Sequence, residues 1–340
     1  MAVVAAVAMP CGEGPDKHAA RMWGVTDAVD AVQDLTGVRY DPMTAVIESH
    51  CLTKRYGSAR GIDEVSISVE RGEIYGFLGP NGAGKTTTIR TLLDLLHPTS
   101  GFARIFGRDS RQASREIRAR LGNLPGDFTC DPRLTGREFL EFCAAARGMD
   151  DLGTGSALAQ RFEADLGRRV RDLSRGNRQK IGLIQALFHD PELLVLDEPT
   201  TGLDPLMQEE FVTMIREYRD RGVTVFLSSH DLDEVERVCD TVAIVRDGRI
   251  AAVENVAELR GRAYHHVSIE FRSPVDDTEF KSLQGVRELE VDGSRVSFKA
   301  FGDLDAVVKA AARHTVKDLE VAEPTLEEIF LTFYGRNGSP

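Results

Sequence analysis

The chain has 340 residues, which is enough for one large domain and a smaller one. Hydrophobic residues make up 42% of it and charged residues 28%, a composition typical of soluble globular proteins. The formal net charge of −12 argues against a nucleic-acid-wrapping surface, because phosphate contacts need clustered lysine and arginine. The sequence also contains no run of about 20 apolar residues that could cross a bilayer.

The N-terminal part of the chain divides near residue 44. Residues 1–43 are rich in alanine, glycine and aspartate and show weak periodicity, so we interpret them as a poorly ordered extension without assignable chemistry. Met43 offers an alternative start of the protein. From Thr44 onward, alternating apolar and polar residues predict a strand at 45–50 and a second one at 65–69.

A phosphate-binding loop is predicted at residues 79–86, which match the pattern G-x-x-x-x-G-K-[ST]. Its residues are Gly79, Pro80, Asn81, Gly82, Ala83, Gly84, Lys85 and Thr86. A buried strand is predicted before it at 73–78 and a helix after it from Thr87, the context that this motif requires. Glycines let backbone N–H groups point at phosphate oxygens, Lys85 is expected at the β- and γ-phosphates, and Thr86 on Mg²⁺.

The middle of the chain changes character. After a turn at 98–101 we expect a short strand at 103–106 and a basic helix at 114–120. Residues 131–172 hold helical segments, at 137–147 behind a capping box and at 157–166, but no convincing strand. This part is predicted to be a helical insertion in an α/β domain.

Two later strands end in polar residues. The apolar run 193–196 predicts a strand buried on both faces of a parallel sheet, and Asp197 and Glu198 follow it at the edge where ligands bind in such sheets. The strand predicted at 223–230 ends in His230 at the same edge. Taken alone, each could be a strand that simply ends in polar residues; the preceding phosphate loop favours a site.

Two helix starts lie near these strands. The segment 173–177 (Leu-Ser-Arg-Gly-Asn) opens a predicted helix at 178–189, whose N-terminus suits an anionic ligand. Asp204 followed by Pro205 predicts the N-cap of a helix that runs to about residue 221.

The C-terminal part predicts a second domain. A hairpin is expected at 242–253 around Asp247-Gly248. Residues 264–322 follow in the order βαββαβ, which is typical of a small ferredoxin-like domain, and a last capped helix is expected from Thr325.

Together these pieces resemble the ATP-binding subunits of ABC transporters over about residues 45–260. The resemblance rests on Tyr56, the loop 79–86, the segments 173–177, 193–198 and 202–204, and His230, in the family's order. The tail 323–331 looks like the ending found in the drug-resistance and ABC-2-type export branch.

The resemblance implies the fold class. It is an α/β fold, with a P-loop NTPase domain of ABC type at 44–260 that carries an antiparallel β-subdomain and the helical insertion. A small accessory α+β domain, ferredoxin-like, is expected at 261–340.

The resemblance also implies the roles of site residues. In the family, two such domains dimerise head to tail around two ATP molecules. The nucleotide contacts would then come from Tyr56 (stacked on adenine, although a lone tyrosine after a strand is more often a half-buried surface residue), Gly79 to Thr87, Ser174, Gly176 and Asp204. Asp197 would support Mg²⁺ together with Thr86, Glu198 would polarise the attacking water, and His230 would contact the γ-phosphate.

This sequence departs from the family pattern at two places. The family usually has Gln after Leu124-Pro125, where this chain has Gly126; Asp127 is a candidate substitute. The signature has Ser-Arg-Gly-Asn in place of Ser-Gly-Gly-Gln but keeps Ser174 and Gly176. We therefore expect nucleotide contact to survive; the departures bear more on the coupling to a membrane partner than on hydrolysis itself.

The leading functional hypothesis is an ATPase subunit that powers export by a separate multi-spanning permease at the cytoplasmic face of the membrane. The alternative is a soluble ABC-type ATPase acting on a ribosome or nucleic-acid complex. The single phosphate loop and the short spacing from Lys85 to Ser174 argue against it. A regulatory module without hydrolysis is a third possibility, and Glu198 and His230 argue against that.

Overall fold

The computed structural model describes residues 45–57, 59–261, 264–276 and 278–322. The extension predicted at 1–43 and the helix predicted from Thr325 lie outside these residues. The chain contacts divide it into two compact units between Val253 and Glu254, and each unit is described by itself. The domain boundary that we expect at 260/261 stays a prediction.

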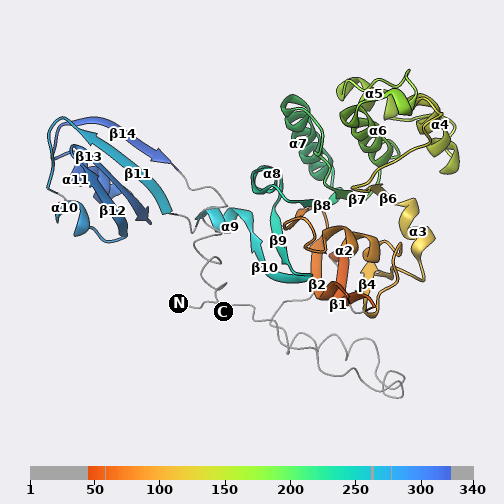
Figure 1. Ribbon diagram of the computed structural model, residues 1–340, viewed down its shortest axis with the longest axis horizontal. Coiled ribbons are helices and arrows are strands. Elements are labelled where there is room, and N and C mark those ends of the chain that lie inside the picture. The colour runs from red at the N-terminus through yellow and green to blue at the C-terminus, as the bar shows by residue number, and fades with distance from the viewer. Residues whose placement is uncertain (1–44, 58, 262–263, 277, 323–340) are drawn as a thin grey trace, which may run out of the picture. The chain divides into compact units, whose positions relative to one another are not determined.

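The first unit contains an antiparallel sheet in the order β2-β1-β4-β5, of which Figure 1 labels β1, β2 and β4. Its strands are β1 (Ala45–Tyr56), β2 (Ala59–Glu70), β4 (Ser100–Ile105) and β5 (Arg108–Asp109). β1 and β2 are each 12 residues long, more than the predicted segments. Shifts of register along the pair, with φ of 44° at Cys51 and 55° at Glu64, let the hairpin continue beyond the alternating stretches.

The second sheet of this unit has six strands in the order β10-β9-β3-β8-β7-β6. They are β3 (Ile74–Leu78), β6 (Leu121–Leu124), β7 (Leu193–Asp197), β8 (Thr224–Ser229), β9 (Thr241–Arg246) and β10 (Arg249–Asn255). β3, β7 and β8 are buried along their whole length, as the near-continuous apolar sequences predict for parallel strands covered on both faces. β6 was not predicted, because its four residues include Gly122 and Asn123.

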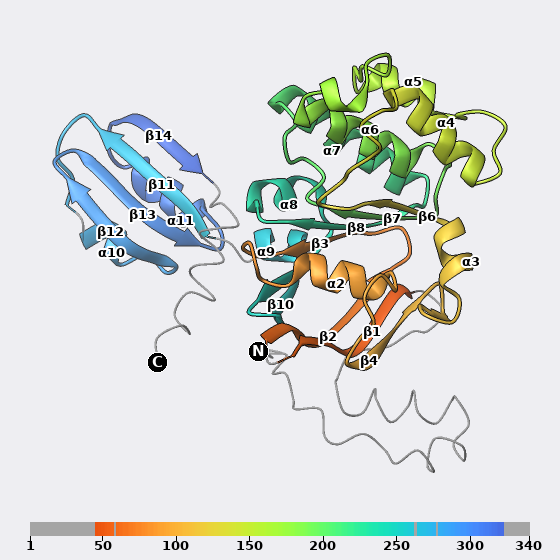
Figure 2. The ribbon, with the colours of Figure 1, turned by 45° about the vertical axis from the view of Figure 1, so that its right-hand side comes forward.

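Helices cover both faces of this sheet (Figure 2). α2 (Lys85–Leu92) contacts β1 and β2 on one side and β7 on the other, so it packs between the two sheets. The other helices are α3 (Ser114–Ala119), α4 (Gly136–Ala146), α5 (Gly155–Arg161), the 3₁₀ turn η2 (Val170–Asp172), α6 (Arg175–Leu187), α7 (Pro205–Asp220) and α8 (Leu232–Val238). No helix in the described part of the chain is long and apolar enough to span a bilayer.

The helical insertion between β6 and β7 differs from its prediction in one helix. α5 ends at Arg161, whereas the predicted helix continues to Leu166. Glu163 adopts a left-handed φ of 51°, which a helix cannot accommodate. Within the described residues 131–172 the only β structure is an isolated bridge between Thr135 and Arg169.

The second unit begins with α9 (Val256–Gly261) and continues as a four-stranded antiparallel sheet. Its elements are β11 (Tyr264–Phe271), α10 (Thr278–Lys281), β12 (Val286–Asp292), β13 (Arg295–Phe301), α11 (Asp305–Ala311) and β14 (Val316–Ala322). The strand order β12-β13-β11-β14 and the βαββαβ sequence of elements are those of a ferredoxin-like fold. Its own core centres on Phe271, Phe280 and Phe298.

Candidate active site

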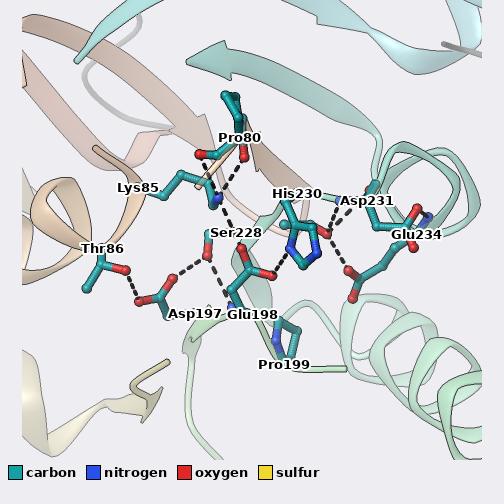
Figure 3. Close-up of polar contacts among 12 residues, drawn as sticks. Pro80, Lys85, Thr86, Asp197, Glu198, Pro199, Ser228, His230, Asp231 and Glu234 are labelled. Carbon is teal, nitrogen blue, oxygen red and sulfur yellow. Dashed lines mark hydrogen bonds and ion pairs between the residues drawn. The ribbon is translucent and has the colours of Figure 1, made fainter. Parts of the chain in front are cut away.

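Three neighbouring parallel strands end at the same level and bring the candidate residues together. In the register of the sheet, Leu78 of β3 pairs with Ser229 of β8, and Asp197 of β7 pairs with Ser228 of β8. The phosphate loop, Glu198 and His230 follow directly from these three strand ends, and Asp197 is the last residue of β7 (Figure 3). Residues that are more than one hundred positions apart in the sequence thus lie together at one edge of the sheet.

The phosphate loop is shaped by close backbone approach. A Cβ at Gly79 would lie 2.4 Å from the carbonyl oxygen of Val245, so only glycine fits there. Gly84 is the N-cap of α2 with φ of 107°, a conformation that other residues rarely adopt. The loop therefore leads directly into the N-terminus of α2, where backbone N–H groups and the helix dipole favour binding of an anion.

Lys85 lies at the centre of the group. Its side chain is 6% exposed, and Nζ donates to the carbonyl oxygens of Gly79 at 2.6 Å and Pro80 at 3.3 Å. Nζ also forms an ion pair with Glu198 Oε1 at 3.1 Å. The ammonium group is thus held inside the phosphate loop and beside the predicted base.

The Asp197 carboxylate is buried, with an exposed fraction of 1%. Thr86 Oγ1 donates to its Oδ2 at 2.7 Å, and Ser228 Oγ donates to its Oδ1. Hydroxyl and carboxylate oxygens are the ligands that Mg²⁺ prefers, and Mg²⁺ usually keeps waters and substrate phosphates as its other ligands, so Thr86 and Asp197 fit this ion. Sequence analysis did not single out Ser228; the signal was a polar residue near the end of an otherwise apolar strand.

Glu198 and His230 are in direct contact. His230 Nδ1 lies 2.6 Å from Glu198 Oε2, and the histidine is about half exposed whereas the glutamate is mostly buried. The backbone N–H of Glu198 donates to Ser228 Oγ at 3.2 Å, and its φ of 51° turns the chain away from the strand direction. Glu198 therefore stands between Lys85 on one side and His230 on the other.

Tyr56 is the last residue of β1 and lies against Gly61, which separates it from the phosphate loop. A Cβ at Gly61 would be 2.8 Å from Tyr56 Cε2, and the carbonyl of Gly61 in turn lies against Gly84. The tyrosine is 46% exposed, so part of its ring is accessible to a stacking partner.

Three further predicted residues lie on helix starts instead of in this cluster. Ser174 is the N-cap of α6 and accepts from the N–H of Asn177 at 3.2 Å, and Asp204 is the N-cap of α7 and accepts from Met207 at 3.0 Å. A Cβ at Gly176 would lie 2.5 Å from the carbonyl oxygen of Gly202, so these two segments touch. Within the described residues none of the three hydrogen-bonds to Lys85, Glu198 or His230.

Besides Ser228, two further residues that sequence analysis missed support the cluster. Gln179 of α6 donates to the carbonyl oxygens of Glu198 at 3.2 Å and Pro199 at 2.9 Å. Glu234 of α8 is 9% exposed and accepts from Ser229 Oγ at 2.5 Å. Burial raises the pKa of the Glu234 carboxyl to about 7. The hydroxyls of Ser229 and Thr200 act to lower this pKa, and the nearby charges of Glu198 and Asp231 act to raise it.

Comparison with known proteins decides the family. The sequence pattern of the family described as ABC transporter matches residues 62–201. The bacitracin transport ATP-binding protein BcrA of Bacillus licheniformis is 41% identical over 214 residues, which cover 61% of this chain and 69% of that protein. The daunorubicin resistance ATP-binding protein DrrA3 of Streptomyces coeruleorubidus is 34% identical over 298 residues, which cover 83% of this chain and 93% of that protein. This chain belongs to the ATP-binding subunits of ABC transporters.

Solved structures agree with the assignment. The ATP-binding subunit of an ABC transporter superposes with a TM-score of 0.59 at 30% identity and covers 63% of this chain and 92% of its own. A dimeric bacterial ABC transporter cassette, at 22% identity and a TM-score of 0.58, shares the fold. The resemblance and the ABC-type fold class predicted from the sequence are thereby confirmed.

The position at which ABC subunits usually have Gln is occupied here by Gly126, which lies against Asp197. A Cβ at Gly126 would be 3.0 Å from Asp197 Oδ2 and 3.2 Å from its Cγ. Asp127, the candidate substitute, instead accepts from Arg90 Nη2 of α2 at 2.8 Å and is exposed. Only the backbone of Gly126 therefore lies against the buried carboxylate of Asp197, and residue 126 offers it no side chain.

We expect Gly126→Ala to slow ATP hydrolysis about three- to tenfold. The added methyl group would press on a carboxylate that Thr86 and Ser228 hold in place, so either Asp197 or the segment around residue 126 must shift. Steady-state ATPase measurements with varied Mg²⁺ would show this as a lower kcat and a higher Mg²⁺ requirement. Gly167→Ala, at a glycine whose Cβ would meet only Asp165 Oδ1 at an ordinary contact distance of 3.7 Å, is the control for general loss of a glycine. Unchanged Mg²⁺ dependence in Gly126→Ala would contradict the close packing.

We expect the free energy of unfolding of Glu234→Gln to rise relative to that of the unsubstituted protein as the pH increases from 5 to 8. The folded protein keeps the Glu234 proton up to about pH 7, whereas the unfolded chain loses it near its usual value of 4.5. The stability that belongs to this carboxyl therefore falls over that interval, by up to about 3 kcal/mol, and Gln does not titrate. Urea unfolding at both pH values measures the difference, with the exposed Asp233→Asn as control. A difference that does not change with pH would refute the raised pKa.

Proposed function

We propose that this subunit binds and hydrolyses ATP, dimerises with a second copy of itself around two ATP molecules, and powers export by a separate membrane permease. The observation that carries the proposal is the joining of Lys85, Glu198 and His230 at one sheet edge, beside the Thr86–Asp197 pair. Phosphoryl transfer depends mainly on positioning and charge neutralisation, and this group supplies both.

In this proposal the phosphates lie on the loop from Gly79 to Thr87, with Lys85 neutralising their charge. Thr86 and Asp197 would hold Mg²⁺, which neutralises phosphate charge when bound. Glu198 accepts hydrogen bonds from the attacking water and orients it, because its carboxylate is held by its neighbours. His230 steadies that carboxylate through the 2.6 Å contact, and Tyr56 offers its accessible ring to the adenine.

The dimer is proposed because the residues Ser174, Gly176 and Asp204 lie on helix starts away from the cluster of their own chain. Ser174 is exposed and opens a helix of 13 residues, whose N-terminus suits the phosphates of a nucleotide bound by the other copy. A site completed across the dimer would make hydrolysis conditional on closure.

Export is proposed from the relatives. Those named above act in bacitracin transport and daunorubicin resistance, and a further one is the Nod factor export ATP-binding protein of Burkholderia orbicola. These names favour a transport role at the cytoplasmic face of the membrane over the ribosome or nucleic-acid alternative. We assign residues 44–260 to the ATP-binding domain and 261–340 to an accessory domain.

Glu198→Gln is expected to bind ATP with Mg²⁺ normally and to hydrolyse it at least a hundredfold more slowly, because the amide cannot accept a proton from water. Such a variant should also dimerise with ATP, which gel filtration would detect.

Lys85→Ala should lose ATP affinity by tenfold or more, since it removes the phosphate counter-charge. Fluorescent-nucleotide binding and phosphate release separate the two variants. Normal turnover by Glu198→Gln would refute its assignment.

Affinity capture of the tagged subunit from detergent-solubilised membranes of its native cell should yield a stoichiometric multi-spanning protein. Mass spectrometry of the eluate identifies it, and the same capture with Lys85→Ala tests whether the association depends on ATP. Recovery of ribosomal proteins or nucleic acid without any membrane protein would overturn the export role and leave the ATP chemistry in place.

A further inference from the structure

A glutamine side chain on α6 binds the backbone immediately after the proposed base. Gln179 Nε2 donates to the carbonyl oxygen of Glu198 at 3.2 Å and to that of Pro199 at 2.9 Å. Because carbonyl oxygens only accept hydrogen bonds, the amide must present its NH₂ group here, and both N–H bonds find an acceptor. One side chain thus connects α6 to two consecutive carbonyl groups in the turn that follows β7.

The two carbonyl groups depend on this amide to different degrees. The Glu198 carbonyl also accepts from the backbone N–H of Thr201 at 3.3 Å. Pro199 is buried, and Gln179 is the one donor to its carbonyl in the described part of the chain. Removing the amide would leave this carbonyl without a partner, which is unfavourable in a buried segment. The segment would then relax toward another direction.

The direction of the chain at Glu198 is set by its neighbours. Its φ of 51° is one that glutamate rarely adopts, so the residue does not favour this conformation by itself. Its backbone N–H is bound to Ser228 of β8, and its carbonyl is bound to Gln179 of α6. Between these two anchors the side chain reaches Lys85 and His230. The position of the carboxylate therefore depends on both anchors.

α6 is a rigid support for the second anchor. It is 13 residues long and buries a row of apolar side chains, among them Ile181 and Ile184. Its start contacts the same turn again, since a Cβ at Gly176 would lie 2.5 Å from the carbonyl oxygen of Gly202. The segment 198–202 is therefore held against one helix at both of its ends.

We propose that Gln179 is a positioning residue for ATP hydrolysis, which fixes the backbone of Glu198 and so keeps its carboxylate in contact with His230 (Figure 3). The inference rests on the proposed function, since it concerns the geometry of the proposed base. It assigns to Gln179 no contact with nucleotide, Mg²⁺ or water. A rotation of the released peptide that moved the carboxylate by about 1 Å would already break the 2.6 Å hydrogen bond to the histidine.

The test compares Gln179→Glu and Gln179→Met with Gln160→Glu, a control at an exposed glutamine of α5. Glutamate keeps the size of the side chain but sets a carboxylate oxygen against two carbonyl oxygens, and methionine keeps the length without a donor. The kcat should fall about tenfold or more in Gln179→Glu and about threefold or more in Gln179→Met. The Kd for ATP should stay within twofold, because the phosphate loop is unchanged. Gln160→Glu should match the unsubstituted protein.

A combined variant shows whether Gln179 acts through Glu198. In Glu198→Gln the carboxylate is already lost, so adding Gln179→Glu should change the remaining hydrolysis rate less than twofold. A further loss by the same factor as in the single variant would show a general structural role and overturn the proposal. Values of kcat for both Gln179 variants within twofold of Gln160→Glu would also overturn it. If Gln179→Glu does not fold, Gln179→Met, which adds no charge, carries the same comparisons.

A measurement without turnover separates this proposal from the proposed function. In protein with ¹⁵N-labelled histidine, the His230 imidazole signals, assigned by their loss in His230→Asn, report the hydrogen bond to Glu198. They should shift in both Gln179 variants and stay in place in Gln160→Glu. Absence of ATPase activity in the unsubstituted protein would refute the proposed function, whereas unmoved His230 signals in the Gln179 variants would refute the positioning role.

Discussion

The candidate site depends on the register of three parallel strands. β3, β8 and β7 are neighbours in the sheet, and the pairs Leu78–Ser229 and Asp197–Ser228 place their carboxyl ends at one level. A shift of one residue in either pairing would turn the side chains of a strand to the opposite face. The phosphate loop, the two acidic residues and the histidine would then no longer meet, whatever their identities.

Asp197 connects the aligned strand ends through hydrogen bonds. Its carboxylate is buried, and it accepts from Thr86 of the helix after the loop and from Ser228 of the adjacent strand. Gly126 packs against the same carboxylate from β6's side of the sheet, where any side chain would crowd it. One carboxylate thereby fixes the separation of segments that come from distant parts of the sequence.

Much of this arrangement could be predicted from local patterns. The apolar runs before Gly79 and through Leu196 indicate central strands because only such strands are apolar on both faces, and the structure places β3 and β7 there. The Asp247-Gly248 turn between β9 and β10 follows from backbone chemistry alone, with φ of 51° and 77°. The boundaries of α5 and the lengths of β1 and β2 could not be predicted, because left-handed residues and bulges at Glu163, Cys51 and Glu64 have no strong local signature.

The contacts that refine the site were harder to predict for a different reason. Gln179, Ser228 and Glu234 are ordinary residue types at ordinary helix and strand positions. Their partners lie 19 to 31 residues away for Gln179 and Ser228. For Glu234 the hydrogen bond is local, but the burial that shifts its pKa is a property of the packed molecule. Neither effect is visible in a window of sequence.

The backbone of Glu198 has a consequence for how this protein can change. A φ of 51° is unfavourable for a glutamate by roughly 1 kcal/mol or more, whereas glycine or asparagine adopts it readily. Natural or laboratory selection for stability and yield alone would therefore favour replacing the residue on which the proposed chemistry depends. Glycine or asparagine would remove this backbone cost but also the carboxylate that contacts Lys85 and His230, so backbone preference and the proposed chemistry oppose each other at this position.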